Sequence, residues 1–583
     1  MKNKIILFCF FCLSLSFVTY AQDIPQHISY TRIYDFLDEL ANDGFFELNS
    51  AVKPYSNKFI SEKLLEAQSQ SEKLNRRQRK EIEFFLNEYA LEQDKLPEAW
   101  LGADWIVDKN GNTKLSLLQP GVFYKDDNFK AKIKPLLGMH ISNNSKGSIT
   151  KRWFGAEFQG TIGKNLTIWG SLRDISMTKV DGDMLSGQTY LNDQPGYQYK
   201  EAAYGGDYSD SRGGIKYGWN WGSLGLVKDN VVWGDNNHGS NIISGRAPSF
   251  PMLTLNLKPA RWFELNYFHG WLVSNELDST YYYIEDGTEK HYRPANKFIA
   301  ANMMTFTPVR NLNLSIGNAI VYGERNVQAA YLIPIAFYKS LDHTLTKGID
   351  SQNQNSQVFF NISSRNIKHL HLYTSVFVDE FSIARLKPSN KQVNPISYKI
   401  GANLSNFPVQ NLSLTGEFTR TNIINYKHSI STLTWASNSY NLGHYLGDNS
   451  QEIYFSLKYK PIRGLDFDLS ITDARHGKEY DYIRGGLDQN GIAGDIKKVI
   501  TYPSLGKIIW KNQTIGLKTV YEVFNNAYAV MNVEYNNAQG FENNDVALYA
   551  ERKMTDQEAL DYYTPKFLQG KNTTITIGFS FGF

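Results

Sequence analysis

The chain has 583 residues, of which 61 are basic and 58 acidic, so its net charge is only +3 at pH 7. This balance argues against a protein that binds nucleic acid or another polyanion through bulk charge. The mean hydropathy is −0.41 and the one long apolar run lies at the N-terminus, so helical membrane spans are not expected.

The first residues have the form of an export signal. Lys2 and Lys4 precede the apolar run, and Thr19 and Ala21 are small residues at the positions that a signal peptidase accepts. The run is also too short to span a bilayer comfortably. We therefore predict that residues 1–21 are a cleaved signal peptide. Because both cysteines lie inside it, the mature chain would have no disulfide and no thiolate chemistry.

Residues 22–99 show the periodicity of amphipathic helices and are expected to form a helical unit at the periplasmic side of the protein. The basic run at residues 76–80 is interpreted as a solvated helix face. Three helices are predicted: one with its apolar stripe at Ile33, Phe36, Leu37 and Leu40 that ends at Asp43 and Gly44, one over Asn57–Gln68 with Ser56 as N-cap, and one capped by Asn75 and Gln78.

Beyond Trp100 the period changes from that of helices to the alternation of strands. In residues 465–472, apolar residues (Leu, Phe, Leu and Ile) occupy every second position, and polar residues (Asp, Asp, Ser and Thr) occupy the positions between them. Pairs of such runs are joined by similar short turns, namely "GKNLTI", "KPARWF", "TPVRNL", "RNIKHL", "FPVQNL" and "KPIRGL". The sequence therefore predicts one hairpin unit that is used repeatedly.

The short turns alternate with long polar connections, which is the pattern of a transmembrane barrel with short turns on one side of the membrane and long loops on the other. We expect an all-β transmembrane barrel over residues 100–583, and a walk along the strands reaches about twenty, with a weak first hairpin at 101–124. A secreted β-solenoid or propeller is the alternative. The long connections fall at roughly 175–211, 234–250, 274–296, 323–355, 380–395, 422–450, 475–513 and 537–571.

The last strand is the clearest case of alternation. Ile575, Ile577, Phe579, Phe581 and Phe583 lie on one side of "TITIGFSFGF" and are expected to face outer-membrane lipid. An aromatic C-terminal residue on such a strand resembles the signal that the outer-membrane assembly machinery reads, so this machinery is a predicted partner.

Residues 233–255 carry a family resemblance. The strand end "VVWG", the polar turn "DNNHGS", the "SGRAPSF" run and "PML" leading into a strand resemble the Wzi-type capsule assembly proteins, and residues 331–365 agree. The resemblance implies an outer-membrane barrel of about 18 antiparallel strands in a Gram-negative bacterium, with a helical bundle at its periplasmic end. It also implies a role in holding capsular polysaccharide at the cell surface. Our own count of twenty strands departs from that figure.

The same motif supplies the candidate site. Aromatic rings grip the C–H faces of sugars, amides and carboxylates bind their hydroxyl groups, and an arginine can pair with a uronate or pyruvate carboxylate. Two other aromatic clusters, at 435–445 and 281–283, have similar chemistry. A loop folded inward that plugs the lumen is an equally open interpretation of the motif. The residues of the candidate site are Trp233, Asp235, Asn236, His238, Ser240, Arg246 and Phe250.

Catalysis, a cofactor and a metal are not predicted. Asp235, His238 and Ser240 lie too close in sequence to form a preformed triad, and Asp235, His238 and His269 lack a diagnostic metal-ligand spacing. The predicted function is therefore non-catalytic binding and anchoring of capsular polysaccharide or exopolysaccharide. A porin or saccharide channel and an outer-membrane hydrolase are the alternatives.

Overall fold

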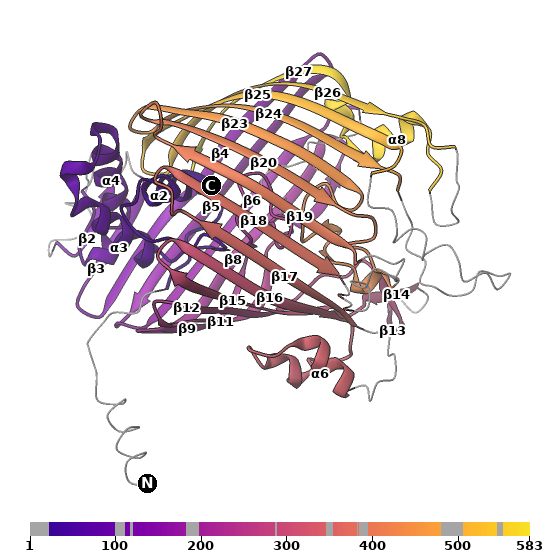
Figure 1. The fold of residues 1–583 in the computed structure, drawn as a ribbon, viewed down its shortest axis with the longest axis horizontal. Coiled ribbons are helices and arrows are strands. Elements are labelled where there is room, and N and C mark those ends of the chain that lie inside the picture. The colour runs from indigo at the N-terminus through magenta and orange to yellow at the C-terminus, as the bar shows by residue number, and fades with distance from the viewer. Residues whose placement is uncertain are drawn as a thin grey trace, which may run out of the picture.

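The computed structural model describes residues 23–98, 111–116, 120–181, 197–285, 289–345, 354–379, 381, 383, 394–428, 430–479, 505–544 and 552–583. A helical unit fills one end of a large barrel, and the long connections extend from the other end (Figure 1). Among the described helices, none is both long enough and apolar enough to cross a membrane.

The helical unit contains the three predicted helices, α2 (Thr31–Asn42), α3 (Asn57–Gln68) and α4 (Arg76–Glu88). Ser56 caps α3 by accepting a hydrogen bond from the Phe59 N–H at 3.2 Å, and Asn75 and Gln78 form a complete capping box on α4. The side-chain oxygens satisfy backbone donors that have no partner within the helix. Both predicted caps are therefore confirmed.

Within the described residues, eighteen antiparallel strands close into one barrel. Each strand pairs with the next along the ring, and the last strand pairs with the first through partners such as Ile577 and Ile141. The strands are β4 (Phe129–Asn144), β5 (Gly147–Ile162), β6 (Leu166–Thr178), β8 (Gly205–Trp219), β9 (Gly222–Asp229), β11 (Phe250–Ala260), β12 (Phe263–Trp271), β15 (Phe298–Val309), β16 (Leu312–Tyr322), β17 (Gln354–Ser364), β18 (Leu370–Asp379), β19 (Ile396–Ser405), β20 (Leu412–Thr421), β23 (Ser450–Ile462), β24 (Leu465–Gly477), β25 (Ile508–Phe524), β26 (Ala527–Gly540) and β27 (Gly570–Phe581).

The count of twenty is corrected by the first hairpin. Strands β2 (Thr113–Ser116) and β3 (Gly121–Lys125) pair with each other, and β3 continues onto residues 130–133 of β4. The part of β4 that closes the barrel, residues 137–143, pairs with β27 instead. The hairpin therefore extends the sheet beside the first residues of β4 without becoming part of the ring, because β27 already pairs with the rest of that edge of β4.

The repeated short turns share one backbone feature. Asn311, His369, Asn411 and Gly464 stand directly before the leucine that starts the next strand, and all four have positive φ, between 61° and 83°. This conformation reverses the chain within a tight turn and suits Asn and Gly best. These turns lie at the helical end of the barrel. One short connection lies at the opposite end, between β4 and β5, where Asn144 pairs with Gly147.

The alternation of the strands places apolar side chains outside the barrel, while the inside combines polar side chains with one apolar cluster that includes Phe268, Ile299 and Phe359. On β27, Ile575, Ile577 and Phe579 are exposed on the outer wall, with Ile577 at 60%. On β24, Asp466 faces inward and receives a hydrogen bond from Arg32 of the helical unit at 2.8 Å. An apolar outer wall and a polar lumen are what a closed strand barrel needs in lipid.

Phe583 departs from the predicted pattern. Gly582 has a positive φ of 75° and turns the chain after Phe581, so Phe583 points into the barrel and not toward lipid. Its ring stacks on His27 with centroids 3.9 Å apart and meets the edge of Tyr30 at 5.4 Å. Four of the five C-terminal apolar residues therefore keep the outward face, and the fifth becomes part of the core of the helical unit.

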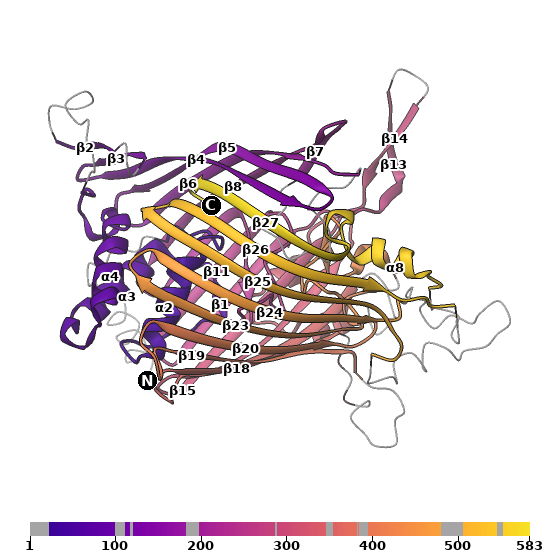
Figure 2. The same ribbon diagram turned by 90° about the horizontal axis from the view of Figure 1, so that it is seen from above.

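The long connections carry several smaller elements. The hairpin of β13 (Leu277–Glu285) and β14 (Glu289–Pro294) projects away from the barrel, as Figure 2 shows. The remaining elements are β1 (Val52–Lys53), β7 (Tyr197–Ala202), β10 (Val232–Trp233), β21 (Ala436–Ser437), β22 (Tyr440–Asn441), α6 (Tyr338–Leu345) and α8 (Asp556–Tyr563), with short 3-10 turns at Ser71–Lys73, Leu91–Gln93, Ala329–Leu332 (η3), Ser431–Leu433 and Lys566–Leu568.

Candidate functional site

The sequence motif forms a loop that enters the barrel. Residues 230–249 leave β9 at the long-loop end, fold into the lumen and return to β11; we call this stretch the lumen loop. At its deepest point β10 pairs with β1 of the N-terminal region, Trp233 with Val52 and Val232 with Lys53. A connection between two barrel strands is thereby joined, by backbone hydrogen bonds, to the helical unit at the opposite end.

The two aromatic candidates of the motif belong to an apolar core inside the barrel. Trp233 is only 2% exposed and meets the rings of Phe268 and Phe359 edge-on, with centroids 5.1 and 5.8 Å apart. Phe250 lies on the same inner wall, 6.2 Å from Phe268. Neither ring is presented to the surface.

Asp235 and Asn236 are held by hydrogen bonds next to this core. Asp235 accepts hydrogen bonds from the Ser50 hydroxyl and from Nδ2 of Asn361, the latter at 2.6 Å. Burial raises the pKa of Asp235, although the nearby Arg365 opposes this effect. The Asn236 amide donates to the Gly234 carbonyl at 2.8 Å, which stabilises the turn of its own loop.

His238 and Ser240 do not form a nucleophile–base pair. His238 Nδ1 lies 3.0 Å from Oε1 of Glu452, and its ring stacks on Tyr454 at 4.2 Å. The Ser240 hydroxyl instead donates to the Trp233 carbonyl within the loop. With Asp235 bonded to other partners, the geometry required for a catalytic triad is not met by these three residues.

His269, the third member of the metal combination considered above, lies on the other side of the barrel wall. Its Nε2 is 2.7 Å from the Tyr322 hydroxyl, and Tyr322 belongs to a cluster on the outer face. Asp235 and His238 lie inside the lumen. The barrel wall therefore separates His269 from the other two candidates.

Arg246 is buried near the outer end of the lumen loop. Its guanidinium lies 5.8 Å from the centre of the Tyr440 ring, which belongs to another long connection. Burial lowers the pKa of Arg246 to about 10, and the nearby Tyr440 acts in the opposite direction. Among the seven candidates, Arg246 and His238 each contact an aromatic side chain of the connection at 422–449, and the rings of His238 and Tyr445 lie 5.7 Å apart.

The connection at 422–449 folds over the lumen loop and covers it. The Trp435 indole donates to the Ile242 carbonyl at 3.0 Å, the Tyr426 hydroxyl donates to the Asn241 carbonyl at 2.7 Å, and Ser244 N–H donates to the Leu442 carbonyl at 2.7 Å. Trp435 is fully buried. The sequence analysis gave this aromatic cluster the chemistry of sugar binding, and in the structure Trp435, His444 and Tyr445 are buried where one loop packs on another.

Ion pairs that the sequence analysis did not predict join the helical unit to the barrel. Arg32 lies 2.6 Å from Glu81 and 2.8 Å from Asp466, and it also contacts Glu522. Lys458 binds Asp35 at 2.6 Å. Further pairs of this kind are Lys460–Glu39, Arg365–Asp38, Lys216–Asp23 and Lys134–Glu88.

The basic run predicted to be solvated is partly involved in this contact. Arg77 is buried, pairs with Glu39 and donates from Nε to Asn411 at 2.9 Å, whereas Arg76, Arg79 and Lys80 are exposed. Arg77 belongs to the buried, barrel-facing side of α4, so the prediction was wrong for this residue.

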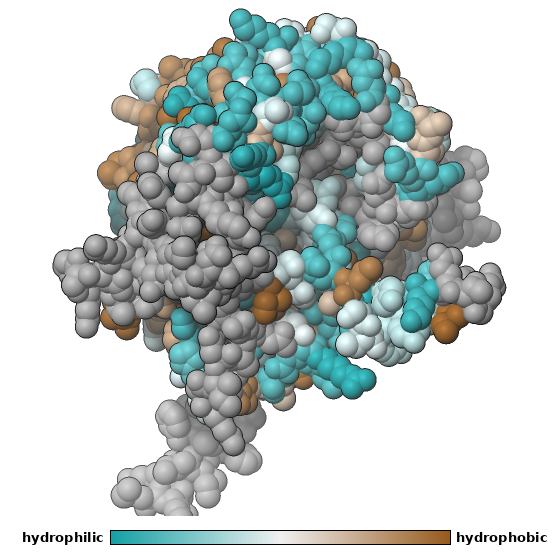
Figure 3. Space-filling model, turned by 90° about the vertical axis from the view of Figure 1, so that its right-hand side faces the viewer, coloured by the Kyte–Doolittle hydropathy of each residue, from teal (hydrophilic) through white to brown (hydrophobic). Residues whose placement is uncertain are grey.

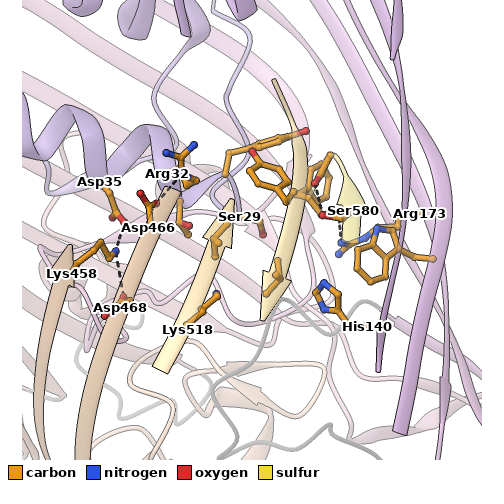
Figure 4. A pocket seen from close by; sticks show the side chains of 18 residues that line it. Ser29, Arg32, Asp35, His140, Arg173, Lys458, Asp466, Asp468, Lys518 and Ser580 are labelled. Carbon is orange, nitrogen blue, oxygen red and sulfur yellow. Dashed lines mark hydrogen bonds and ion pairs between the residues drawn. The ribbon is translucent and has the colours of Figure 1, made fainter. Parts of the chain in front are cut away.

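A polar cavity of about 170 Å³ remains between the helical unit and the strands that close the barrel. Figure 4 shows Arg32 directed toward Asp466 and Lys458 placed between Asp35 and Asp468, while His140, Arg173 and Ser580 lie on the other side. Opposite charges already pair across the lining. The cavity is suited to ordered water more than to a bulky polymer.

The long-loop end of the molecule carries a different chemistry. The side chains coloured in Figure 3 are mostly hydrophilic. On the projecting hairpin, Arg293 lies over the ring of exposed Tyr281 and Lys290 over that of exposed Tyr282, both at 4.5 Å. On the opposite side, Arg552 lies 5.5 Å from the ring of exposed Tyr562 in α8. Tyrosine–cation pairs therefore recur on elements outside the barrel.

The comparisons with known proteins agree with this fold. The family model described as capsule assembly protein Wzi matches residues 185–512, which is more than half of the chain. No curated protein matches the sequence.

Among solved structures, the Escherichia coli outer-membrane protein Wzi has a TM-score of 0.52 at 10% identity, and the match covers 97% of this chain and 100% of that one. Its structure is described as a carbohydrate-binding β-barrel involved in group 1 capsule assembly. OccAB1 of Acinetobacter baumannii has a TM-score of 0.42 at 8% identity over 78% of this chain and 96% of its own, and OprD of Pseudomonas aeruginosa has 0.38 at 11% over 77% and 94%.

The matched family and the closed barrel with its apolar outer wall identify an outer-membrane protein. The chain belongs to the Wzi family of capsule assembly proteins.

Proposed function

We propose that this protein binds capsular polysaccharide or exopolysaccharide at the cell surface and anchors it there without covalent chemistry. Its family and the described carbohydrate binding of the E. coli barrel support this role. The single observation that carries the proposal is the set of exposed tyrosine–cation pairs on the projecting hairpin and on α8.

The chemistry of these pairs suits an acidic polymer. An exposed tyrosine ring offers an apolar face to sugar C–H groups, and the neighbouring Lys or Arg offers charge to a carboxylate. One such pair would bind a single sugar weakly. Because a polysaccharide repeats its unit, several pairs can be engaged at once, and the combined affinity rises far above that of each contact.

The contacts of the lumen loop support the non-catalytic part of this proposal. His238 binds Glu452, the Ser240 hydroxyl donates to its own loop, and Asp235 is bonded to Ser50 and Asn361. These side chains hold the loop in place and are not arranged around a reacting atom. We propose that all seven motif residues act primarily by keeping the lumen closed, with Arg246 the candidate nearest to glycan.

The test is surface retention of polysaccharide. In a deletion strain we expect total polymer to stay constant and to move from the cell to the medium, and the wild-type gene should reverse this. Tyr281→Ala with Tyr282→Ala should release polymer, whereas Tyr281→Phe with Tyr282→Phe, which keeps the rings, should retain it. Phe407→Ala, an exposed aromatic at a short turn of the opposite end, is the matched control.

The channel alternative is separated from anchoring by a second measurement. If the deletion leaves the distribution of polymer unchanged and the protein conducts in planar bilayers, the protein would be a channel. An Arg246→Ala, Trp233→Ala variant tests the motif itself. Loss of retention without a gain in conductance would assign Arg246 to the polymer, and a gain in conductance would assign the pair to closure of the lumen.

Recognition of the C-terminus by the outer-membrane assembly machinery stays a prediction. Because Phe583 is buried in the folded protein, this recognition would act on the chain before the barrel closes. Removal of Phe583 should lower the amount of assembled barrel in the outer membrane, measured by heat-dependent gel migration. Unchanged assembly would remove the machinery as a partner of this residue.

A further inference from the structure

One segment of the chain lies against the outside of the barrel. Residues 327–345, here called the outer-wall segment, belong to the connection between β16 and β17 and contain η3 and α6. Figure 1 shows α6 beside the barrel, next to β16. The long connections at 230–249 and 422–449 fold inward, whereas this one turns back along the outer surface.

The side chains on which this segment packs establish that it is outside. Its Tyr331 and Tyr338 are buried in one cluster with Phe298 of β15 and Ile320 of β16. On β15 the next residue, Ile299, belongs instead to the core inside the lumen. Since neighbouring residues of a strand point to opposite faces, the cluster covers the outer wall.

Two asparagines hold the segment on the wall. Asn302 and Asn318 face each other across β15 and β16, and both side-chain amides donate to the Ala336 carbonyl, at 2.9 and 3.1 Å. Oδ1 of Asn318 accepts the Tyr338 N–H at 2.9 Å. An amide that points into lipid has no water to bond and is costly there. The segment removes that cost by supplying backbone partners.

Over residues 332–337, the face that the segment turns away from the barrel is apolar, whereas Ser340, His343 and Thr344 are exposed on α6. Ile335 is 65% exposed and Phe337 is 50% exposed, and Leu332, Ile333 and Leu345 are exposed as well. The sequence has no charged residue between Arg325 and Lys339. This surface continues the exposed apolar wall formed on the same strands by Leu314 and Ile316.

We propose that the outer-wall segment is embedded in the membrane, with Ile333, Ile335 and Phe337 among the acyl chains of the outer leaflet. The partner is lipid hydrocarbon. The continuity with the lipid-facing wall, the uncharged run before Lys339 and the hydrogen bonds of Asn302 and Asn318 all fit a segment that lies in the bilayer without crossing it. The segment thus broadens the barrel on one side and gives it a lipid contact independent of the polysaccharide function.

A spin label at Ile335 tests this assignment. The two cysteines of the chain, Cys9 and Cys12, precede the predicted cleavage site, so Ile335→Cys would carry the only thiol of the mature protein. In lipid vesicles, collision rates of the nitroxide with oxygen and with a water-soluble nickel chelate report depth. Phe154→Cys, 69% exposed on the wall of β5, is the lipid reference, and Ile284→Cys, 56% exposed on the projecting hairpin, is the aqueous reference.

We expect the oxygen-to-nickel ratio at Ile335 to lie within about twofold of that at Phe154 and at least tenfold above that at Ile284. A ratio like that at Ile284 would place the segment in water and overturn the proposal. Low collision with both reagents would mean that protein, such as a second copy, covers it, which also overturns the assignment to lipid. Phe337→Cys is a second reporting site if Ile335→Cys assembles poorly.

The asparagine contacts give an independent readout. Asn302→Ala with Asn318→Ala should free the segment, so nickel collision at Ile335 should rise severalfold while the value at Phe154 stays constant. An unchanged value at Ile335 would contradict the role of the two amides in holding the segment at membrane depth.

Discussion

The two ends of the lumen are closed by different chemistry. The helical unit is fixed by ion pairs such as Arg32 with Asp466, whereas the lumen loop is fixed by the aromatic core around Trp233 and by backbone pairing. A closure built on ion pairs is specific, because each carboxylate needs its own cation, and its stability depends on pH. A closure built on apolar packing depends on shape, and its stability falls when a side chain loses volume. The comparison predicts that each closure can be released separately.

The largest effect is expected at Arg32. Arg32→Ala leaves Glu81, Asp466 and Glu522 without their shared cation in a buried site. Breaking a buried ion pair costs up to about 5 kcal/mol, and here three carboxylates are left. Hydrogen exchange of the α2 backbone should therefore accelerate sharply. Arg79→Ala on the exposed face of α4 is the control, and equal exchange in both variants would show that the charged seat does not hold the unit.

Trp233→Ala tests the apolar closure. Truncation of a buried tryptophan leaves a cavity and costs about 4 kcal/mol. We expect faster exchange at β10 and a rise in single-channel conductance, with α2 protected as before. Trp262→Ala, at an exposed position of a short turn, should change neither quantity. Exposure of α2 together with β10 would mean that the two closures form one cooperative unit.

Acid should distinguish the two closures. Burial raises the pKa of Glu39, but Arg77 and Lys460 outweigh this and lower it from its ordinary 4.5 to about 2. The folded unit therefore binds fewer protons than the unfolded chain. Its stability from Glu39, ~3 kcal/mol, is present above pH 4.5 and is lost as the pH falls toward 2.

The pKa of Asp235 in the lumen loop is raised by burial, so the contribution of this carboxyl to stability has the opposite dependence on pH. Protonation of this buried carboxyl as the pH falls favours the folded loop. As the pH falls, the protection of α2 against hydrogen exchange, relative to the intrinsic rate at each pH, should be lost before that of β10. Glu39→Gln removes the titrating group and should flatten the α2 profile; a profile that stays as steep would assign the acid sensitivity to another carboxylate.

The smallest effect on stability is expected at α8, at the long-loop end of the barrel. Thr555 and Glu558 form a capping box at the start of α8, which carries Tyr562. Thr555→Ala should cost about 1 kcal/mol, confined to α8, because one backbone donor loses its acceptor. Exchange at residues 556–563 measures it, and both lumen closures should be unaffected. Thr555→Ser, which keeps the hydroxyl, should behave as the wild type, and a loss there would implicate the methyl group.

Local signals in the sequence predicted much of the fold. Alternation in residues 465–472 gave the faces of β24, and Ser56 and Asn75 marked the starts of two helices. These features depend on neighbours a few residues apart. The seven candidate residues were likewise recognised as a unit, with the inward fold as one of two interpretations.

The missed features depend on contacts between distant parts of the chain. The pairing of Asp235 with Ser50 joins residues 185 positions apart, and the burial of Arg77 depends on Asn411. Gly582 was a local signal for the inward turn of Phe583, because glycine tolerates positive φ. The outer-wall segment had a signal too, in Asn302 and Asn318 at positions that otherwise face lipid.

The contact of Phe583 with His27 links the helical unit to closure of the barrel. His27 stacks on Phe583, and Arg173 donates to the Phe583 carbonyl at 2.7 Å, so the N-terminal helical unit and the residue that follows β27 share one contact site. The same strand β27 closes the ring by pairing with β4. This contact site is therefore complete only in a closed barrel.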